Sequence, residues 1–528
     1  MANSKYEYVK SFEIEDEVMV PNIIVVYIDG RDFGRFSEAH RFDTSNDRKA
    51  LQLMNACGTA VLEEFPDIAF AYGFGNEFSF VFKKETKFYQ RRASKIYSLM
   101  VSFFTSVFVT KWKCTFPQLE LRIPPSFHSR VICCGSIVVL QAYLMWRQNE
   151  SHIRNQYATC FWELVKRGKC VAEAKSMLKG THKQEKNDLL FLKFGINYKK
   201  DVPEIFRQGS CILRKEVQDI VKYLENLTPV RRKRKKVVIV HSENIATGNF
   251  WNNQESLNKD VGVFGEGIDN LKSEYIKSFQ YESKLMPSTW IVIRIDGCHF
   301  HRFCDAHSFE KPNDEQALNL MNSCAVAVVE EFRDIVFAYG VSDEYSFVLN
   351  KDSSLYQRRA SEIVSAVVSL FSSVYLMKWK EFFPQKDLKY PPYFDGRSVC
   401  YPSSKILRDY LAWRQVDCHI NNQYNTCFWM LVKSGKTKTE AQNVLKGTQT
   451  PEKIELLSQF GIDYHSLPSI FRFGSSVFWN KKESPHSAMA NCHKKVTVEH
   501  SNIIDTNFWK AHPTILEEIS HCCQAPGT

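Results

Sequence analysis

Three acidic residues of this chain stand where two extended segments end and begin. Asp296 follows the β-branched run Trp290-Ile-Val-Ile-Arg-Ile295, which predicts a buried strand. Asp343 and Glu344 lie at a tight turn, Gly340-Val-Ser-Asp343, that opens another strand. If the two strands are neighbours, the carboxylates gather at one end of a sheet and repel one another unless cations are bound. Such a cluster suits two Mg²⁺ ions that clamp phosphate oxygens.

Residues that suit phosphate chemistry surround this cluster. Gly297 would let a backbone carbonyl and a triphosphate approach closely. The basic candidates for phosphate contacts are Arg294, His301, Arg302 and Lys311. Either motif taken alone would also be explained by an ordinary turn, because Asp-Gly and Ser-Asp are common turn sequences.

The sequence segments that must position these residues occur twice along the chain. Ile28-Asp-Gly30 returns as Ile295-Asp-Gly297, and Trp146-Arg-Gln148 returns as Trp413-Arg-Gln415, both at an offset of 267 residues. The repeating unit is a whole domain, which excludes a short-period solenoid. The sequence predicts a first repeat over 1–260, a linker over 261–270, a second repeat over 271–515 and a tail over 516–528.

Within each repeat the periodicity changes from strand-like to helix-like and back. In the second repeat we expect a strand at 290–295, a helix at 314–332, strands at 335–339 and 344–349, and a long helix at 356–379. This order predicts an α+β domain, in which an antiparallel sheet packs against helices.

Taken together, the motifs resemble one known family. They include Arg294-Ile-Asp-Gly-Cys-His-Phe-His-Arg-Phe303, Ala338-Tyr-Gly-Val-Ser-Asp-Glu-Tyr-Ser-Phe347, Phe394-Asp-Gly-Arg397 and Asp417-Cys-His-Ile-Asn-Asn-Gln-Tyr-Asn425. The chain is similar to the tRNA-histidine guanylyltransferases, which are 3′-to-5′ polymerases, through essentially the whole of both repeats. A doubled form is typical of plants.

The resemblance implies a palm-like, polymerase- or cyclase-like fold and a reaction in steps. ATP would activate the tRNA 5′-monophosphate as an adenylate, and the 3′-hydroxyl of GTP would then attack it. Pyrophosphate would be removed later, which leaves one guanosine at position −1 of tRNA-His. This chemistry needs positioning and charge neutralisation rather than a covalent nucleophile.

The resemblance also assigns roles by position. Asp296 and Asp343, with the Gly297 carbonyl, would hold two Mg²⁺ ions, and Glu344 would complete the catalytic acids. Nucleotide contacts would come from Arg294, Asp296, Gly297, Cys298, His299, Phe300, His301, Lys311, Ser342 and Asp343. Contacts with tRNA would come from Arg31, Lys95, Arg358, Arg359, His419, Asn421, Asn422 and Lys453.

Two of these groups also have a plain structural interpretation. From the residues alone, His419, Asn421 and Asn422 are equally well explained as polar groups that satisfy their neighbours on a helix face. The aromatic residues at helical spacing favour a hydrophobic core over a platform for stacking bases; they are Tyr410, Trp413, Tyr424, Phe428 and Trp429.

The two repeats are not chemically equivalent. The first carries Asp29, Gly30, Asn76 and Glu77 where the second carries Asp296, Gly297, Asp343 and Glu344. Asn76 lacks the anionic oxygen that a bound Mg²⁺ needs. Three phosphate-binding candidates are lost as well, because Tyr27, Gly34 and Thr44 replace Arg294, His301 and Lys311. We therefore expect a silent first repeat and a catalytic second repeat.

The second repeat departs from the family pattern at two positions that stay basic in the first. Cys298 and Glu362 stand where the first repeat has Arg31 and Lys95. Residues 1–267 contain 40 Lys and Arg against 30 Asp and Glu, so the whole net charge of +10 lies there. We expect the first repeat to hold tRNA while the second catalyses.

Composition sets the remaining bounds. Of the 528 residues 44% are hydrophobic and 24% charged, which is typical of a globular protein. Sixteen cysteines without a C-x-x-C spacing indicate thiols in a reducing compartment, and no zinc site or membrane span is expected. The basic run Arg231–Lys236 is explained by a solvated loop, a nuclear-import signal or an RNA contact. It favours the nucleus, with the cytoplasm as the alternative.

Other functions stay open at this point. A template-dependent polymerase that repairs tRNA 5′ ends would share every feature and differ in substrate range. A nucleotide cyclase would share the two-metal site, and a non-catalytic RNA-binding scaffold would require a dead second repeat. Because single-copy relatives form tetramers, we expect this chain to dimerise into a pseudo-tetramer.

Overall fold

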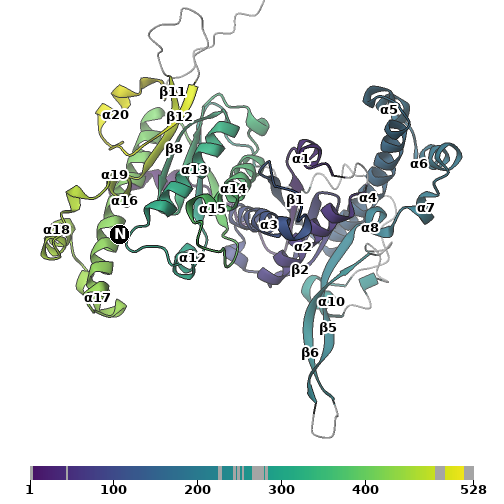
Figure 1. Ribbon diagram of the computed structural model, residues 1–528, viewed down its shortest axis with the longest axis horizontal. Helices are drawn as coiled ribbons and strands as arrows, with labels where there is room; N and C mark the ends of the chain where they lie inside the picture. Colours follow the sequence, from purple (N-terminus) through teal and green to yellow (C-terminus); the bar gives the residue numbers. More distant parts are fainter. Residues whose placement is uncertain are drawn as a thin grey trace, which may run out of the picture. The chain divides into compact units, whose positions relative to one another are not determined.

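The computed structural model describes residues 4–42, 46–223, 229–241, 245, 250–251, 255–263, 279, 283–481 and 494–515. The chain divides into two compact units (Figure 1). The first-repeat unit is Asp16–Glu282, and the second-repeat unit is Met1–Glu15 together with Ser283–Thr528. Each is described here by itself.

Each unit is built on a six-stranded antiparallel sheet, as the sequence predicts. In the second-repeat unit the order is β10-β7-β9-β8-β11-β12. The strands are β7 (Trp290–Gly297), β8 (Ile335–Val341), β9 (Glu344–Leu349), β10 (Phe394–Tyr401), β11 (Ser475–Lys481) and β12 (Lys494–Glu499).

The first-repeat unit repeats this topology as β4-β1-β3-β2-β5-β6. Its strands are β1 (Ile23–Gly30), β2 (Ile68–Phe74), β3 (Glu77–Phe82), β4 (Phe127–Cys134), β5 (Ser210–Tyr223) and β6 (Pro229–Val240). The β5–β6 pair is about twice as long as its counterpart β11–β12, with 14 and 12 residues against 7 and 6.

Helices cover the two faces of each sheet. In the second-repeat unit α13 (Glu315–Glu331) and α14 (Ala360–Met377) pack on one face, and α16 (Ser404–Lys433) packs on the other. Their counterparts in the first-repeat unit are α2 (Arg48–Glu64), α3 (Ala93–Thr115) and α4 (Ile137–Lys166). The remaining helices near the site are α12 (Phe300–Ala306), α15 (Trp379–Phe382), α17 (Lys438–Leu445), α18 (Thr450–Gln459) and α19 (Ser469–Phe473).

Two expectations about local structure were wrong. The helix expected over 356–379 is preceded by a short 3₁₀ turn, η4 (Leu355–Arg358), in which Tyr356, Gln357 and Arg358 have positive φ, and α14 begins only at Ala360. The basic run Arg231–Lys236 lies in strand β6, paired with β5, rather than in a loop. A run of charges on a two-sided ribbon does not show the alternation by which a half-buried strand is recognised.

The compact units also differ from the sequence boundaries at the N-terminus. The 3₁₀ helix η1 (Glu7–Phe12) belongs to the first repeat in sequence, yet it packs against β10 and α16 of the second-repeat unit. Conversely, Phe279 packs against the core of the first-repeat unit, and its carbonyl accepts a hydrogen bond from the Cys133 amide. The predicted tail, Thr44 and most of the predicted linker lie outside the described residues.

Two described helices, α3 and α14, are long and apolar enough to cross a membrane by composition alone. In each, 83% of the most apolar stretch is buried inside the protein, as in the core helix of a globular domain. The cysteines among the described residues are free thiols.

Candidate active site

Carboxylates line up across three strands at one end of the second sheet. Asp296 on β7 lies directly opposite Glu344 on β9 and opposite Asp395 on β10. Directly opposed residues of antiparallel strands project from the same face, so the three form an acidic row. The expectation that the two predicted strands are neighbours is thereby confirmed.

The turn between β8 and β9 places Asp343 beside this row. Ser342 has a positive φ of 55°, which tightens the turn, and the Gly297 amide donates a hydrogen bond to the Asp343 carbonyl at 3.1 Å. A Cβ on Gly297 would lie 2.6 Å from the ring of Phe300. The residue must therefore be glycine for reasons of packing.

The electrostatics of the row favour a bound cation. Surrounding protein atoms, together with the carboxylates of Asp343, Glu344 and Asp395, raise the pKa of Asp296 to about 7. Burial likewise raises the pKa of Asp343. Carboxylates with raised pKa values at one spot are a common sign of a functional site.

Hard oxygen donors of this kind fit Mg²⁺. Within the described part of the chain, no three His, Cys, Asp or Glu side chains are grouped as a complete set of ligands for one ion. The set expected from sequence contains only two such side chains, Asp296 and Asp343, with the Gly297 carbonyl as the third ligand.

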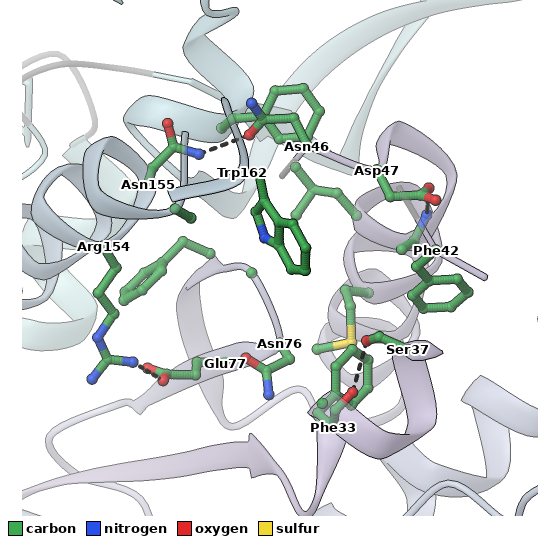
Figure 2. Close-up of a pocket in the computed structure, with 18 of the residues that line it drawn as sticks. Phe33, Ser37, Phe42, Asn46, Asp47, Asn76, Glu77, Arg154, Asn155 and Trp162 are labelled. Atoms are coloured by element: carbon green, nitrogen blue, oxygen red, sulfur yellow. Dashed lines mark hydrogen bonds and ion pairs between the residues drawn. The ribbon is translucent and has the colours of Figure 1, made fainter. Parts of the chain in front are cut away.

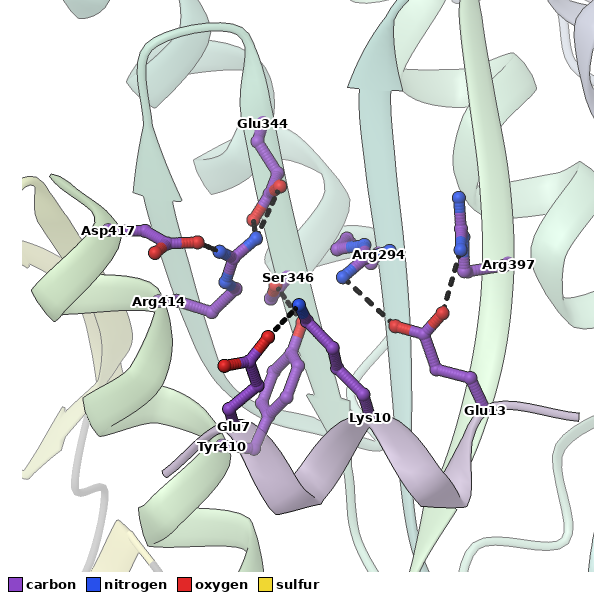
Figure 3. Close-up of polar contacts among 10 residues, drawn as sticks. All are labelled: Glu7, Lys10, Glu13, Arg294, Glu344, Ser346, Arg397, Tyr410, Arg414 and Asp417. Atoms are coloured by element: carbon purple, nitrogen blue, oxygen red, sulfur yellow. Dashed lines mark hydrogen bonds and ion pairs between the residues drawn. The ribbon is translucent and has the colours of Figure 1, made fainter. Parts of the chain in front are cut away.

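Glu344 differs from the other two predicted acids. Both of its carboxylate oxygens accept hydrogen bonds from Arg414, at 2.9 and 3.1 Å, and Arg414 also pairs with Asp417 (Figure 3). The guanidinium compensates the charge of Glu344, whereas neither Asp296 nor Asp343 forms a salt bridge with another of the described residues.

A cavity of about 570 Å³ opens beside Asp343. Five of the residues predicted to bind nucleotide line it: Phe300, His301, Lys311, Ser342 and Asp343. The Lys311 ammonium pairs with Asp305 at 3.2 Å and lies 5.6 Å from the ring centroid of Trp429. The cavity thus combines acids, a cation and aromatic surface.

Asn421 and Asn422, predicted to contact tRNA, line this same cavity from α16. Asn421 is exposed, whereas Asn422 is buried and accepts a hydrogen bond from Asn313 at 3.0 Å. His419 lies one turn away against Tyr464 and Phe473, where burial lowers its pKa. Of the aromatic set, Tyr410 and Trp413 belong to the core as expected, but Phe428 and Trp429 also line the cavity.

The other residues predicted to contact the nucleotide do not line this cavity. The Cys298 amide donates to the Tyr393 carbonyl at 2.9 Å, and His299 adopts a positive φ of 52° at the start of α12. Arg294 lies on the same face as the acidic row, two residues before Asp296, and pairs with Glu13 at 3.2 Å.

Several residues predicted to bind tRNA have structural partners instead. The Arg358 guanidinium donates to the carbonyl groups of Leu285, Met286, Thr289, Lys351 and Ser353. The Lys453 ammonium is buried and donates to the Thr448 carbonyl at 2.7 Å. Lys186 makes the same contact with Thr181 in the first-repeat unit, which indicates that both residues hold the fold together.

The remaining basic candidates are half-buried in their units. Arg359 pairs with Glu362 at 2.9 Å, so the acid that replaces Lys95 has a cationic partner on its own helix. In the first-repeat unit, Lys95 lies 5.0 Å from the ring centroid of Tyr89, and Arg31 donates to the Ser126 hydroxyl at 3.2 Å. Their contact with tRNA stays a prediction.

The corresponding cavity of the first-repeat unit is lined by largely equivalent positions but differs in its chemistry (Figure 2). It measures about 770 Å³, and the hydrogen bond between Asn46 and Asn155 repeats that between Asn313 and Asn422. Glu77 accepts from both Arg147 and Arg154. Although burial opposes it, these two arginines hold the pKa of Glu77 below its ordinary value.

Sequence reasoning missed Asp395 as a member of the site. It is buried, lies opposite Asp296, and is replaced by His128 in the first repeat, opposite Asp29. The motif Phe394-Asp-Gly-Arg397 contains the sign of this role. The first repeat lacks an acid at the position of Asp395, just as it lacks one at Asn76. Arg154 was missed for a similar reason. It adds a cation in the first repeat where the second has Asn421, which a comparison of the two repeats position by position reveals.

An antiparallel palm-like sheet with acids at one end, beside a cavity with a lysine and aromatic rings, defines a nucleotidyl-transferring class of protein. Residues 6–135 and 273–402 match the family model described as tRNAHis guanylyltransferase, and residues 138–249 and 405–516 match its C-terminal domain model. The chain belongs to the tRNA(His) guanylyltransferase family.

Individual relatives include both doubled and single-length proteins. The chain is 65% identical to tRNA(His) guanylyltransferase 1 of Arabidopsis thaliana, over 98% of this chain and 91% of that protein. The tRNA(His) guanylyltransferase of Schizosaccharomyces pombe is 49% identical and covers 46% of this chain and 95% of its own length. The chain is also similar to the tRNA(His) guanylyltransferase of Saccharomyces cerevisiae in its crystal structure. The two are 45% identical, the match covers 39% of this chain and 93% of that chain, and the TM-score is 0.38.

Proposed function

We propose that this protein is a tRNA(His) guanylyltransferase whose second repeat carries out the chemistry. Its substrates are ATP, GTP and the 5′ end of tRNA-His, and the product carries an added guanosine at position −1. The observation that carries the proposal is the acidic row with Asp343, which is complete in the second repeat and interrupted by His128 and Asn76 in the first.

The residues of the second repeat divide the work. Asp296, Asp343 and the Gly297 carbonyl would hold two Mg²⁺ ions, which when bound neutralise the triphosphate and the attacking oxygen. Lys311 and His301 face the phosphates from the cavity wall. Asn421, Asn422 and Trp429 lie across that cavity, where they orient the nucleotide or the end of the RNA.

The first repeat serves as the part that holds RNA. Its β5–β6 ribbon carries Arg231–Lys236, of which Arg234, Lys235 and Lys236 are exposed. Phosphate contacts of this kind give affinity that falls with salt and does not depend on sequence. Lys95 and Arg31 add basic groups on the same unit. The same run supports a nuclear location, with the cytoplasm as the alternative, and we propose that two chains associate as a pseudo-tetramer.

One incubation separates the candidate functions. The protein is mixed with Mg²⁺, labelled GTP, ATP and a 5′-monophosphorylated tRNA-His transcript. The proposal expects one labelled guanosine at the 5′ end, dependent on ATP. A labelled cyclic nucleotide would indicate a cyclase, and no product would indicate a scaffold. Equal labelling of truncated tRNAs of other kinds would favour a general 5′-end repair polymerase.

A further inference from the structure

The chain's own N-terminal segment, residues 4–15, is built into the second-repeat unit. Val9 is fully buried in that unit's core, and the ring of Phe12 lies 5.6 Å from the ring of Tyr401 on β10, tilted by 59°. The Tyr8 hydroxyl donates to Asp409 at 2.5 Å, and the Lys10 ammonium lies 5.2 Å from the ring centroid of Trp413. These contacts join residues about 400 positions apart in sequence.

Glu13, at the end of this segment, reaches the face of the sheet that carries the acidic row. Its two carboxylate oxygens pair with Arg294 at 3.2 Å and with Arg397 at 2.8 Å (Figure 3). The three side chains are 23%, 12% and 23% exposed, so the pairs are only partly screened by solvent. Arg294 and Arg397 are opposite one another on β7 and β10, two residues along from Asp296 and Asp395.

A comparison of the two repeats in sequence independently supports this arrangement. Segment 4–15 corresponds to 271–282, and the counterpart of Glu13 is Gln280. Arg294 corresponds to Tyr27, and Asp409, the partner of Tyr8, corresponds to Ala142. The acid at position 13 therefore matches the arginines of the second repeat. Packed on its own repeat, it would meet Tyr27 and Arg130.

The described part of the other segment fits a reciprocal exchange. Phe279, the counterpart of Phe12, packs in the core of the first-repeat unit, as Phe12 does in the second. Among the described residues, each unit thus receives an aromatic side chain from the start of the other repeat.

We propose that residues 4–15 are a working part of the second domain, in which Glu13 is a positioning residue for the active site. Glu13 holds Arg294 and Arg397 in place beside the acidic row. Without it, Arg294 is left to pair with the carboxylate of Asp296 on the same face and to compete there with a cation. The functional half of this inference rests on the proposed function, and the structural half does not.

The structural half is tested by unfolding of the full-length chain. Glu13→Gln, Arg397→Gln and the double variant form one cycle, and Glu13→Gln, Arg130→Gln and their double variant form the matched cycle in the other repeat. We expect shifts in the denaturation midpoint that are non-additive for Glu13 with Arg397 and additive for Glu13 with Arg130. The reverse pattern would overturn the exchange.

The functional half is tested by the kinetics of Glu13→Gln. We expect kcat/KM for guanylylation to fall about tenfold, and the Mg²⁺ concentration needed for half-maximal rate to rise, so that added Mg²⁺ restores most of the rate. Gln280→Glu is the control and is expected to leave both values unchanged.

The two tests fail in different ways. A normal Mg²⁺ requirement in Glu13→Gln, or a lost rate that Mg²⁺ does not restore, would overturn the positioning role. If the parent protein itself adds no guanosine, the proposed function fails while the unfolding cycles still decide the exchange.

Discussion

The acidic row predicts that two reciprocal substitutions, one in each repeat, change the stability of their units in opposite directions. Asp343→Asn gives the second repeat the residue of the first, and Asn76→Asp does the converse. In metal-free buffer the first change removes a carboxylate whose charge helps to raise the pKa of Asp296. We therefore expect Asp343→Asn to stabilise the metal-free second-repeat unit and Asn76→Asp to destabilise the first.

The magnitude follows from the pKa of Asp296, which rises from 3.8 to about 7 in the folded protein. An acid with a raised folded pKa binds its proton more tightly when folded. It therefore does not destabilise the fold at a pH below the pKa that it has in the unfolded chain, and its full destabilisation is reached above pH 7. Three units would correspond to ~4 kcal/mol. Because Asp296 is an exposed residue, solvent screening reduces this to ~1–2 kcal/mol, of which Asp343 accounts for a part of order 0.5–1 kcal/mol.

The assay is hydrogen exchange followed by mass spectrometry in EDTA, read on peptides that span β8–β9 and, as the control, β2–β3. Between about pH 5 and pH 8 the metal-free protein should lose protection in β8–β9, and Asp343→Asn should flatten that loss. Mg²⁺ should restore protection in the parent and not in the variant. The reasoning is refuted if Asp343→Asn weakens protection at pH 8 in EDTA.

Three further outcomes follow from the contacts described. Arg358→Ala should lower the free energy of unfolding by ~2–3 kcal/mol, because five carbonyl groups lose their donor, while the affinity for tRNA measured by filter binding stays within about twofold; a large loss of affinity with unchanged stability would contradict the structural role. Arg234→Glu with Lys235→Glu should weaken tRNA binding and flatten its salt dependence, whereas Lys495→Glu, a charge reversal in β12 at the position that corresponds to Lys236, should not; equal effects would argue against the β5–β6 ribbon as the RNA contact. Asp395→Asn should lower the guanylylation rate at least tenfold without loss of the fold by circular dichroism, and a normal rate would remove Asp395 from the site.

Much of the fold and part of the site could be predicted from the sequence. Alternation and β-branched runs identify β7, β8 and β9, and the turn at Ser342 brings Asp343 to Asp296, because these signals are local. The break before α14 was not predictable from the local pattern. Tyr356 and Gln357 have positive φ, and the guanidinium of the adjacent Arg358 binds carbonyl groups of the distant segment 285–289.

The contacts that could not be predicted from the sequence share a physical reason. Lys453 and Arg358 look like surface cations, yet each is occupied by backbone carbonyl groups that only the tertiary fold brings near. Asp395 and Glu13 were overlooked because their partners lie on strands or segments far away in the chain. A comparison of the two repeats position by position identifies both, because the first repeat has His128 where the second has Asp395, and the second has Gln280 where the first has Glu13.

The central claim is that the second repeat catalyses and the first does not. It is tested most directly by guanylylation of a 5′-monophosphorylated tRNA-His transcript by Asp343→Ala in the second repeat and by Asp29→Ala in the first repeat, each in the full-length chain. The account predicts that Asp343→Ala reduces the addition of guanosine by at least a thousandfold, while Asp29→Ala retains nearly the full rate. Comparable losses from the two substitutions would contradict it.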